Sequence, residues 1–117
     1  HACALDGEGA LFCWGQDFDG SVTGAMNRNA RVNHPVPLRF PNLPPIDRVT
    51  IGSHTTWAHA KGGAWYAFGP SNDRVFTFGA VTSDRPNGLV PGTEHVRDIV
   101  GTDEFLCALN DDRSVSC

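Results

Sequence analysis

The stretch CALDGEGALFC, residues 3–13, has a near copy in CALNDDRSVSC, residues 107–117. In each copy, two cysteines ten positions apart flank a polar turn. A third copy lies between them, where Trp57 and Ala67 take the two cysteine positions. The anchor positions 3, 57 and 107 are therefore separated by steps of 54 and 50 residues. A repeat of this period is typical of folds built from similar supersecondary units.

The segments that lead into the second and third copies repeat as well. IDRVTIG, residues 46–52, begins eleven positions before Trp57, and Val96 in VRDIVG lies the same eleven positions before Cys107. Short apolar stretches alternate with turn residues, and no segment has the pattern of an amphipathic helix of three turns. We predict an all-β chain with one domain, 1–117, made of repeat units at approximately 1–45, 46–95 and 96–117. The first and last units are expected to be incomplete.

The composition and charge of the chain argue against two classes of function. The chain has 117 residues, of which 40% are hydrophobic and 19% charged, and its formal net charge is −4. The nine lysines and arginines form no basic block, which argues against nucleic-acid binding. No apolar run approaches the length of a membrane helix, so we expect no membrane span.

The cysteine spacing favours two local disulfides. If the first turn is centred on Glu8, Cys3 faces Cys13, and the same construction places Cys107 opposite Cys117. This pairing is favoured over the two alternative connectivities, and each bond would stabilise its hairpin by about 3 kcal/mol. Buried free thiols and a structural zinc site are the alternatives, although the chain has no Cys-x-x-Cys. Disulfides indicate an extracellular, cell-surface or periplasmic protein.

These residues resemble repeats of the regulator of chromosome condensation type, particularly their cysteine-bearing bacterial versions. The family pattern runs from His-x-Cys-Ala-Leu through an Asp-Gly turn to Cys-Trp-Gly, followed by an Asn and a Gly. The middle copy departs from it, with Thr55 at the His position and Phe68 at the Trp position. The matching stretches are HACAL at 1–5, Asp6-Gly7, LFCWG at 11–15, Asp17 with Gly20, and LCALNDDRSVSC at 106–117.

The resemblance implies a β-propeller, typically of seven blades, each a four-stranded antiparallel sheet. A chain of this length would supply about two blades, whereas propellers need about four to eight to close. Two blades alone would leave apolar faces uncovered. We therefore expect the chain to be a segment of a longer propeller, or one part of an assembly that supplies the remaining blades.

No catalytic motif stands out. The sequence lacks Gly-x-Ser-x-Gly, a phosphate loop and His-Glu-x-x-His, so we predict no enzyme activity, no cofactor and no metal. The DFDGS stretch, residues 17–21, could begin a calcium loop, but we interpret it as a turn in which Asp17 accepts hydrogen bonds from its own backbone. His54 and His59 have opposite parity and cannot share a metal within one strand. The aromatic residues expected to pack between blades are Phe12, Trp14, Trp65 and Tyr66.

The long connection at residues 24–45 is the predicted interaction loop, since a rigid scaffold can present a loop to a partner. The candidate contact residues in it are Asn27, Arg28, Arg31 and Arg39. The equivalent stretch of the middle unit is residues 71–85.

The function predicted from the sequence is that of a non-enzymatic extracellular or cell-surface propeller for protein interaction or structural assembly. One alternative is a carbohydrate-binding or enzymatic propeller with its site at the central channel. A third hypothesis, guanine-nucleotide exchange or chromatin binding, suits disulfides poorly, because nuclear and cytosolic compartments are reducing.

Overall fold

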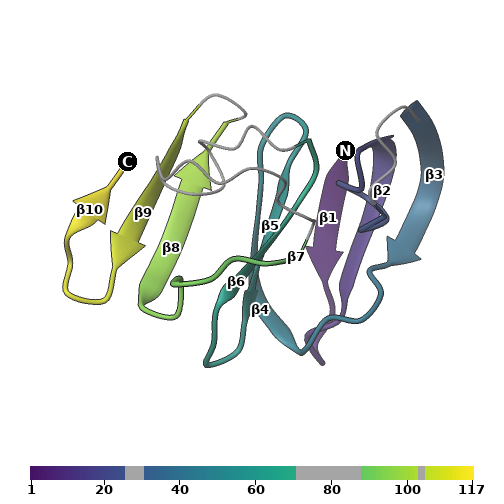
Figure 1. Cartoon of the computed structure of the whole chain (residues 1–117). Helices are drawn as coiled ribbons and strands as arrows, with labels where there is room; N and C mark the ends of the chain where they lie inside the picture. The colour runs from purple at the N-terminus through teal and green to yellow at the C-terminus, as the bar shows by residue number, and fades with distance from the viewer. Residues whose placement is uncertain (26–30, 71–87, 103–104) are drawn as a thin grey trace.

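The computed structural model describes residues 1–25, 31–70, 88–102 and 105–117. In these ranges the chain forms ten strands in three antiparallel sheets that lie side by side (Figure 1). The first sheet contains β1 (Ala2–Leu5), β2 (Leu11–Phe18) and β3 (Arg31–Arg39). The middle sheet contains β4 (Ile46–Ile51), β5 (Thr56–Ala60), β6 (Trp65–Phe68) and β7 (Gly88–Leu89). The last sheet contains β8 (Val96–Gly101), β9 (Leu106–Asn110) and β10 (Val115–Ser116).

The all-β prediction is confirmed, since the described ranges contain strands and no helix. Each sheet falls within one of the three repeat ranges, so the described chain has three sheets where about two blades were expected. The middle sheet has the four strands expected of a blade, whereas three strands are described in each of the others. No helix in the described ranges is both long and apolar enough to cross a bilayer.

The hairpin register follows the sequence prediction. Cys3 pairs with Cys13, and Trp57 pairs with Ala67 at the equivalent position of the middle sheet. Disulfides join Cys3 to Cys13 and Cys107 to Cys117, each across 4.1 Å between Cα atoms. The turns of the three hairpins are closed by the same backbone bond, from Asp6 N to Ala10 O at 3.0 Å, Ala60 N to Ala64 O at 3.1 Å and Asn110 N to Ser114 O at 2.9 Å.

The expected interaction loop at residues 24–45 is not a loop throughout. Its residues Arg31–Arg39 form β3, a nine-residue strand that contains Pro35 and Pro37. Proline has no N–H to donate, which normally excludes it from the interior of a sheet. The strand order β1-β2-β3 makes β3 an edge strand, so the prolines can be accommodated where no second neighbour needs their N–H. The loop prediction was wrong for this stretch, because pairing with β2 holds residues 31–39 in an extended strand.

The middle sheet buries both of its faces. Alternate residues of a strand point to opposite sides, and Trp57 and Ala58 accordingly lie in different apolar cores. Trp57, Trp65 and Ala67 pack toward β8 and β9 of the last sheet. The opposite side packs against Leu11 and Cys13 of the first sheet through Ala58, Ala60 and Phe68.

A buried hydroxyl links the first sheet to the middle one. Thr56 Oγ1 donates to the carbonyl of Ser21 at 2.7 Å and lies 2.8 Å from His1 Nε2, which is therefore the donor to it. His1, which stands at the His position of the family pattern, therefore contacts the middle sheet through this hydroxyl. Thr55 takes the His1 position in the middle sheet, and its buried Oγ1 has no hydrogen-bond partner in the described part of the chain.

Two glycines allow close approach of neighbouring backbone in equivalent places. Gly15 lies within β2 and Gly69 directly follows β6, and their φ values are 101° and 123°. A Cβ on Gly15 would lie 2.9 Å from the Cα of His1, and one on Gly69 would overlap the carbonyl of His54. Glycine is required at both positions because other residues rarely adopt this backbone conformation and would collide.

The pair of adjacent threonines gives a matched test of the buried link. We expect Thr56→Val to lower the free energy of unfolding by about 1–3 kcal/mol, because it leaves the Ser21 carbonyl and His1 without their partner. Thr55→Val should be neutral or stabilising, because it removes a buried hydroxyl that makes no bond. Urea unfolding of both variants measures the difference. Equal destabilisation by the two changes would show that the Thr56 link contributes nothing of its own.

The two disulfides should differ in reactivity. Cys13 is fully buried between sheets, whereas Cys117 is exposed. Thiol–disulfide exchange requires access to sulfur, so a reductant titration should open Cys107–Cys117 before Cys3–Cys13. Alkylation followed by peptide mass spectrometry measures the order, and the unreduced protein should show only these two linkages. Free thiols in that sample, or the reverse order of opening, would contradict the expectation.

Candidate binding site

The four predicted contact residues do not form one site. Asn27 and Arg28 lie outside the described residues, as does the equivalent stretch 71–85. Arg31 and Arg39 begin and end β3. Eight residue steps of extended strand separate them by about 26 Å, at roughly 3.3 Å per residue. The structure therefore divides the described candidates between two ends of the first sheet.

Arg31 is engaged within the chain. Its guanidinium lies 5.2 Å from the ring centroid of Phe18, the residue paired with it across β2 and β3. The same ring meets the His54 ring edge-on at a centroid distance of 4.2 Å. Arg31 thus makes a cation–π contact within the first sheet, to the ring that contacts His54.

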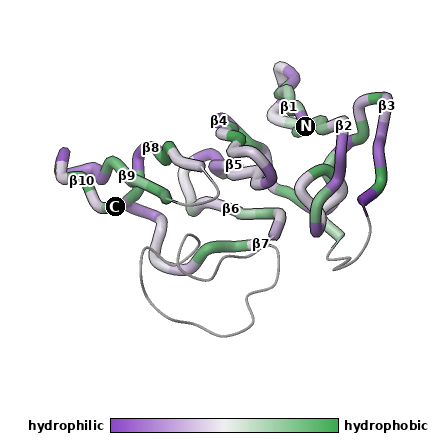
Figure 2. The backbone as a smooth tube through the Cα atoms, turned by 90° about the horizontal axis from the view of Figure 1, so that it is seen from above, coloured by the Kyte–Doolittle hydropathy of each residue, from purple (hydrophilic) through white to green (hydrophobic). Residues whose placement is uncertain are grey.

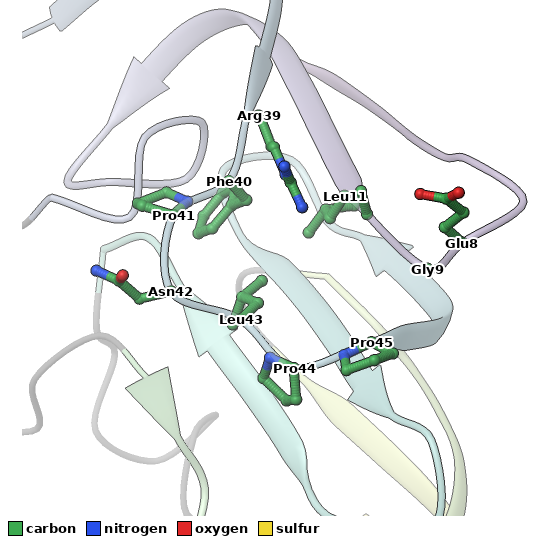
Figure 3. A pocket seen from close by; sticks show the side chains of 11 residues that line it. Glu8, Gly9, Leu11, Arg39, Phe40, Pro41, Asn42, Leu43, Pro44 and Pro45 are labelled. Carbon is green, nitrogen blue, oxygen red and sulfur yellow. The ribbon is translucent and has the colours of Figure 1, made fainter.

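Arg39 lines a cavity of about 440 Å³ at the opposite end of this junction. One wall is the β1–β2 turn with Glu8, and the other is the connection from β3 to β4 (Figure 3). In Figure 3 the Arg39 side chain points toward Leu11 and Leu43, which form the apolar floor of this space. The lining residues are Glu8, Gly9, Ala10, Leu11, Arg39, Phe40, Pro41, Asn42, Leu43, Pro44 and Pro45.

Backbone hydrogen bonds fix the two walls of this Arg39 cavity. Phe40 N donates to Leu11 O at 2.8 Å, and Ile46 N donates to Gly9 O at 2.9 Å. Gly9 has a φ of 86°, and an added Cβ would lie 2.9 Å from the Ile46 nitrogen. The chain turns at Asn42, in the wall formed by residues 41–45. Asn42 has a φ of 56°, a backbone conformation that asparagine adopts more readily than most residues. The cavity is consequently held open by rigid backbone.

The Arg39 guanidinium has no hydrogen bond or ion pair within the described residues. The charge of Arg39 acts on Asp6 in the neighbouring β1–β2 turn, whose carboxylate accepts hydrogen bonds from Ala10 N at 2.8 Å and Glu8 N at 2.9 Å. These bonds, first from Ala10 and then from Glu8, lower the pKa of Asp6, and the charge of Arg39 acts in the same direction. A free guanidinium beside an apolar floor is suited to a ligand that carries a carboxylate next to an apolar group.

A second cavity, of about 320 Å³, occupies the equivalent position between the middle and last sheets. Two of its lining residues have charged or titratable partners: His59 Nδ1 lies 2.6 Å from Asp47 Oδ1, and Arg48 lies 3.5 Å from Asp98. Arg48 also donates to the carbonyl of Arg97 at 2.7 Å. Val96 is the one aliphatic residue in the lining of this cavity, so it offers a ligand less apolar surface than the Arg39 cavity and is the weaker candidate for binding.

The DFDGS stretch forms a turn, as interpreted from the sequence. Asp17 is buried, and its carboxylate accepts from Val22 N at 3.0 Å and Thr23 Oγ1 at 2.6 Å. Its oxygens are therefore occupied by local donors. Across the described ranges, no three His, Cys, Asp or Glu side chains gather where they could hold a metal ion.

Sequence reasoning identified Arg39 but missed most of its surroundings. Leu11 and Glu8 were assigned only to the hairpin, and Phe40 and Leu43 were treated as part of the connection. The sequence did contain a signal for the proline-rich wall of the cavity. PNLPP, residues 41–45, has three prolines in five residues, which predicts a stiff segment.

The aromatic residues expected between blades differ in burial. Trp65 is fully buried and Tyr66 packs at the core, whereas Phe12 and Trp14 are half-buried.

Comparison with known proteins does not identify a family. No protein-family model matches the chain, and no curated protein matches it. The resemblance to condensation-regulator repeats therefore rests on the residues quoted above.

The pKa of Asp6 predicts how acid affects the first hairpin. A carboxylate whose pKa is lowered on folding contributes stability above its unfolded pKa of about 3.8, and this contribution is lost as the pH falls through the folded pKa. Asp6→Asn should remove that pH dependence and keep the turn, since Asn110 stands at the equivalent position. Melting temperatures of both proteins between neutral and strongly acidic pH measure it. Parallel curves would refute the assignment.

Proposed function

We propose that this chain is part of an extracellular β-propeller that acts as a non-enzymatic protein-interaction module. Support for the propeller comes from the way in which the sheets stack. The same hairpin positions face the next sheet at both junctions, Cys3 and Cys13 at one and Trp57 and Ala67 at the other. A propeller consists of antiparallel sheets that repeat, each packed face to face against the next. The two disulfides support an oxidising, extracellular setting.

The observation that carries the interaction role is the unpaired Arg39 guanidinium over the floor of Leu11 and Leu43. Binding sites commonly combine an apolar lining with a few fixed polar groups that orient the ligand. An extended peptide that places an aliphatic side chain on this floor and an adjacent carboxylate on Arg39 fits this arrangement. Glu8, on the other wall, favours a cationic or N–H-bearing group at the opposite end of the peptide.

Parallel peptide and glycan arrays test this proposal. The wild-type chain should bind peptides in which an acidic residue adjoins an aliphatic one, and it should show no comparable glycan binding. We expect Arg39→Ala to weaken peptide binding at least about tenfold, because it removes a charge-assisted contact worth roughly 1.5–3 kcal/mol.

Arg113→Asn is the matched control. It removes the same charge from the exposed β9–β10 turn, which does not line the Arg39 cavity, and asparagine tolerates the φ of 69° at this position, so peptide binding should be unchanged. Equal losses in the two variants would indicate non-specific attraction to a positive charge. Binding to glycans without peptides would favour the carbohydrate-binding alternative and overturn the proposal.

A further inference from the structure

The Arg39 cavity carries a second charged side chain, Glu8, on the wall formed by the β1–β2 turn (Figure 3). Glu8 is exposed, and its backbone N–H donates to the Asp6 carboxylate at 2.9 Å. Within the described residues, the Glu8 carboxylate makes no hydrogen bond or ion pair. The cavity therefore offers a ligand one positive and one negative group, each on its own wall.

The middle sheet forms the same elements without either charge. β3 and β7 are each the edge strand of their sheet (Figure 2), and Leu89 in β7 takes the pairing position that Arg39 has in β3. Gly62 stands at the position of Glu8, 54 residues further along the chain. The backbone hydrogen bond that follows each edge strand is 2.8 Å long in both sheets. Because the fold forms at the equivalent positions without them, Glu8 and Arg39 are available for recognition.

The separation of the two charges limits the ligand that can contact both. The Arg39 side chain points toward Leu11 (Figure 3), and Glu8 lies three residues before Leu11. At roughly 3.3 Å per residue, three steps of strand cover at most about 10 Å. An extended peptide spans this distance in about three residue steps.

The two walls add a second condition, because they face the ligand from different sides. Successive side chains of an extended peptide point to opposite sides of its backbone. In a peptide that lies between the β1–β2 turn and the β3–β4 connection, residues an odd number of positions apart therefore face different walls. A separation of three positions satisfies both conditions, whereas separations of two or four direct both side chains to one wall.

We propose that the Arg39 cavity selects a peptide segment in which an acidic and a basic residue are three positions apart. The acidic residue contacts Arg39, the basic residue contacts Glu8, and an aliphatic residue beside the acidic one contacts Leu11. This proposal rests on the proposed function, because it specifies the peptide that the same cavity binds. Complementary charges discriminate against other segments, since a residue of the wrong sign on either wall meets a like charge.

Isothermal titration calorimetry with end-blocked peptides of a single composition tests the spacing. In Asp-Leu-Lys-Ser-Ser, Asp-Leu-Ser-Lys-Ser and Asp-Leu-Ser-Ser-Lys, the two charges are two, three and four positions apart. The same peptides in reverse order cover a segment that runs the other way through the cavity. In one of the two series, the three-position peptide should bind about two- to fivefold more tightly than the others, as expected for an exposed ion pair.

Charge reversals assign each peptide charge to its wall. Glu8→Lys should abolish the preference for the three-position peptide, because the basic residue then faces a like charge. The double variant Glu8→Lys, Arg39→Glu should prefer the peptide with its charges exchanged, Lys-Leu-Ser-Asp-Ser, in the same chain direction. Glu94→Lys is the matched control. It makes the same change of charge at an exposed residue of the second cavity and should keep the wild-type preference.

Three results would overturn the proposed spacing: equal affinity for all separations in both series, a preference that survives Glu8→Lys, or one that Glu94→Lys removes equally. If Arg39→Ala still weakened peptide binding in any of these cases, the proposed function would stand. Absence of all peptide binding would overturn both proposals, and the array experiment detects that outcome by itself.

Discussion

Alternate residues of β5 and β6 pack against different neighbours. Trp57, Trp65 and Ala67 meet the last sheet, while Ala58 and Phe68 meet the first. A strand has only two faces, and here both are buried in the middle sheet, so each side chain must suit one particular neighbour. Burying an aromatic or aliphatic side chain of this size contributes about 1.5–3 kcal/mol. The order of the sheets and the positions of their hairpins depend on this double burial.

The cystines are one of two solutions to the same packing requirement. In the first sheet, the Cys3–Cys13 bond fills the space at the junction and also restricts the unfolded chain. In the middle sheet, a large residue opposite a small one, Trp57 and Ala67, fills the equivalent space without a covalent bond. The middle hairpin instead gains a hydrogen bond from Trp65 Nε1 to the Val96 carbonyl at 2.9 Å, which fixes the last sheet against it.

The candidate binding site is a consequence of how the first two sheets meet. The Gly9 carbonyl accepts a hydrogen bond from Ile46 N and so holds the start of β4 against the first hairpin, and the proline-rich segment 41–45 that precedes β4 lines the space beside it. That space becomes the cavity into which the end of β3 delivers Arg39. Binding would use a charge that lies beside the apolar floor of this cavity, whereas Arg48 at the next junction contacts Asp98.

The sequence by itself determined the local features: the repeat, the all-β class, the register of Cys3 with Cys13 and the two disulfides. These depend on residues ten positions apart and on an alternation of period two, so a short window contains all the information. Only the tertiary structure decided that Arg31–Arg39 is a strand, because its prolines are tolerated only at the edge created by pairing with β2. It also separated Arg31 from Arg39 and built a cavity around the second, because both outcomes depend on contacts between segments far apart in the chain.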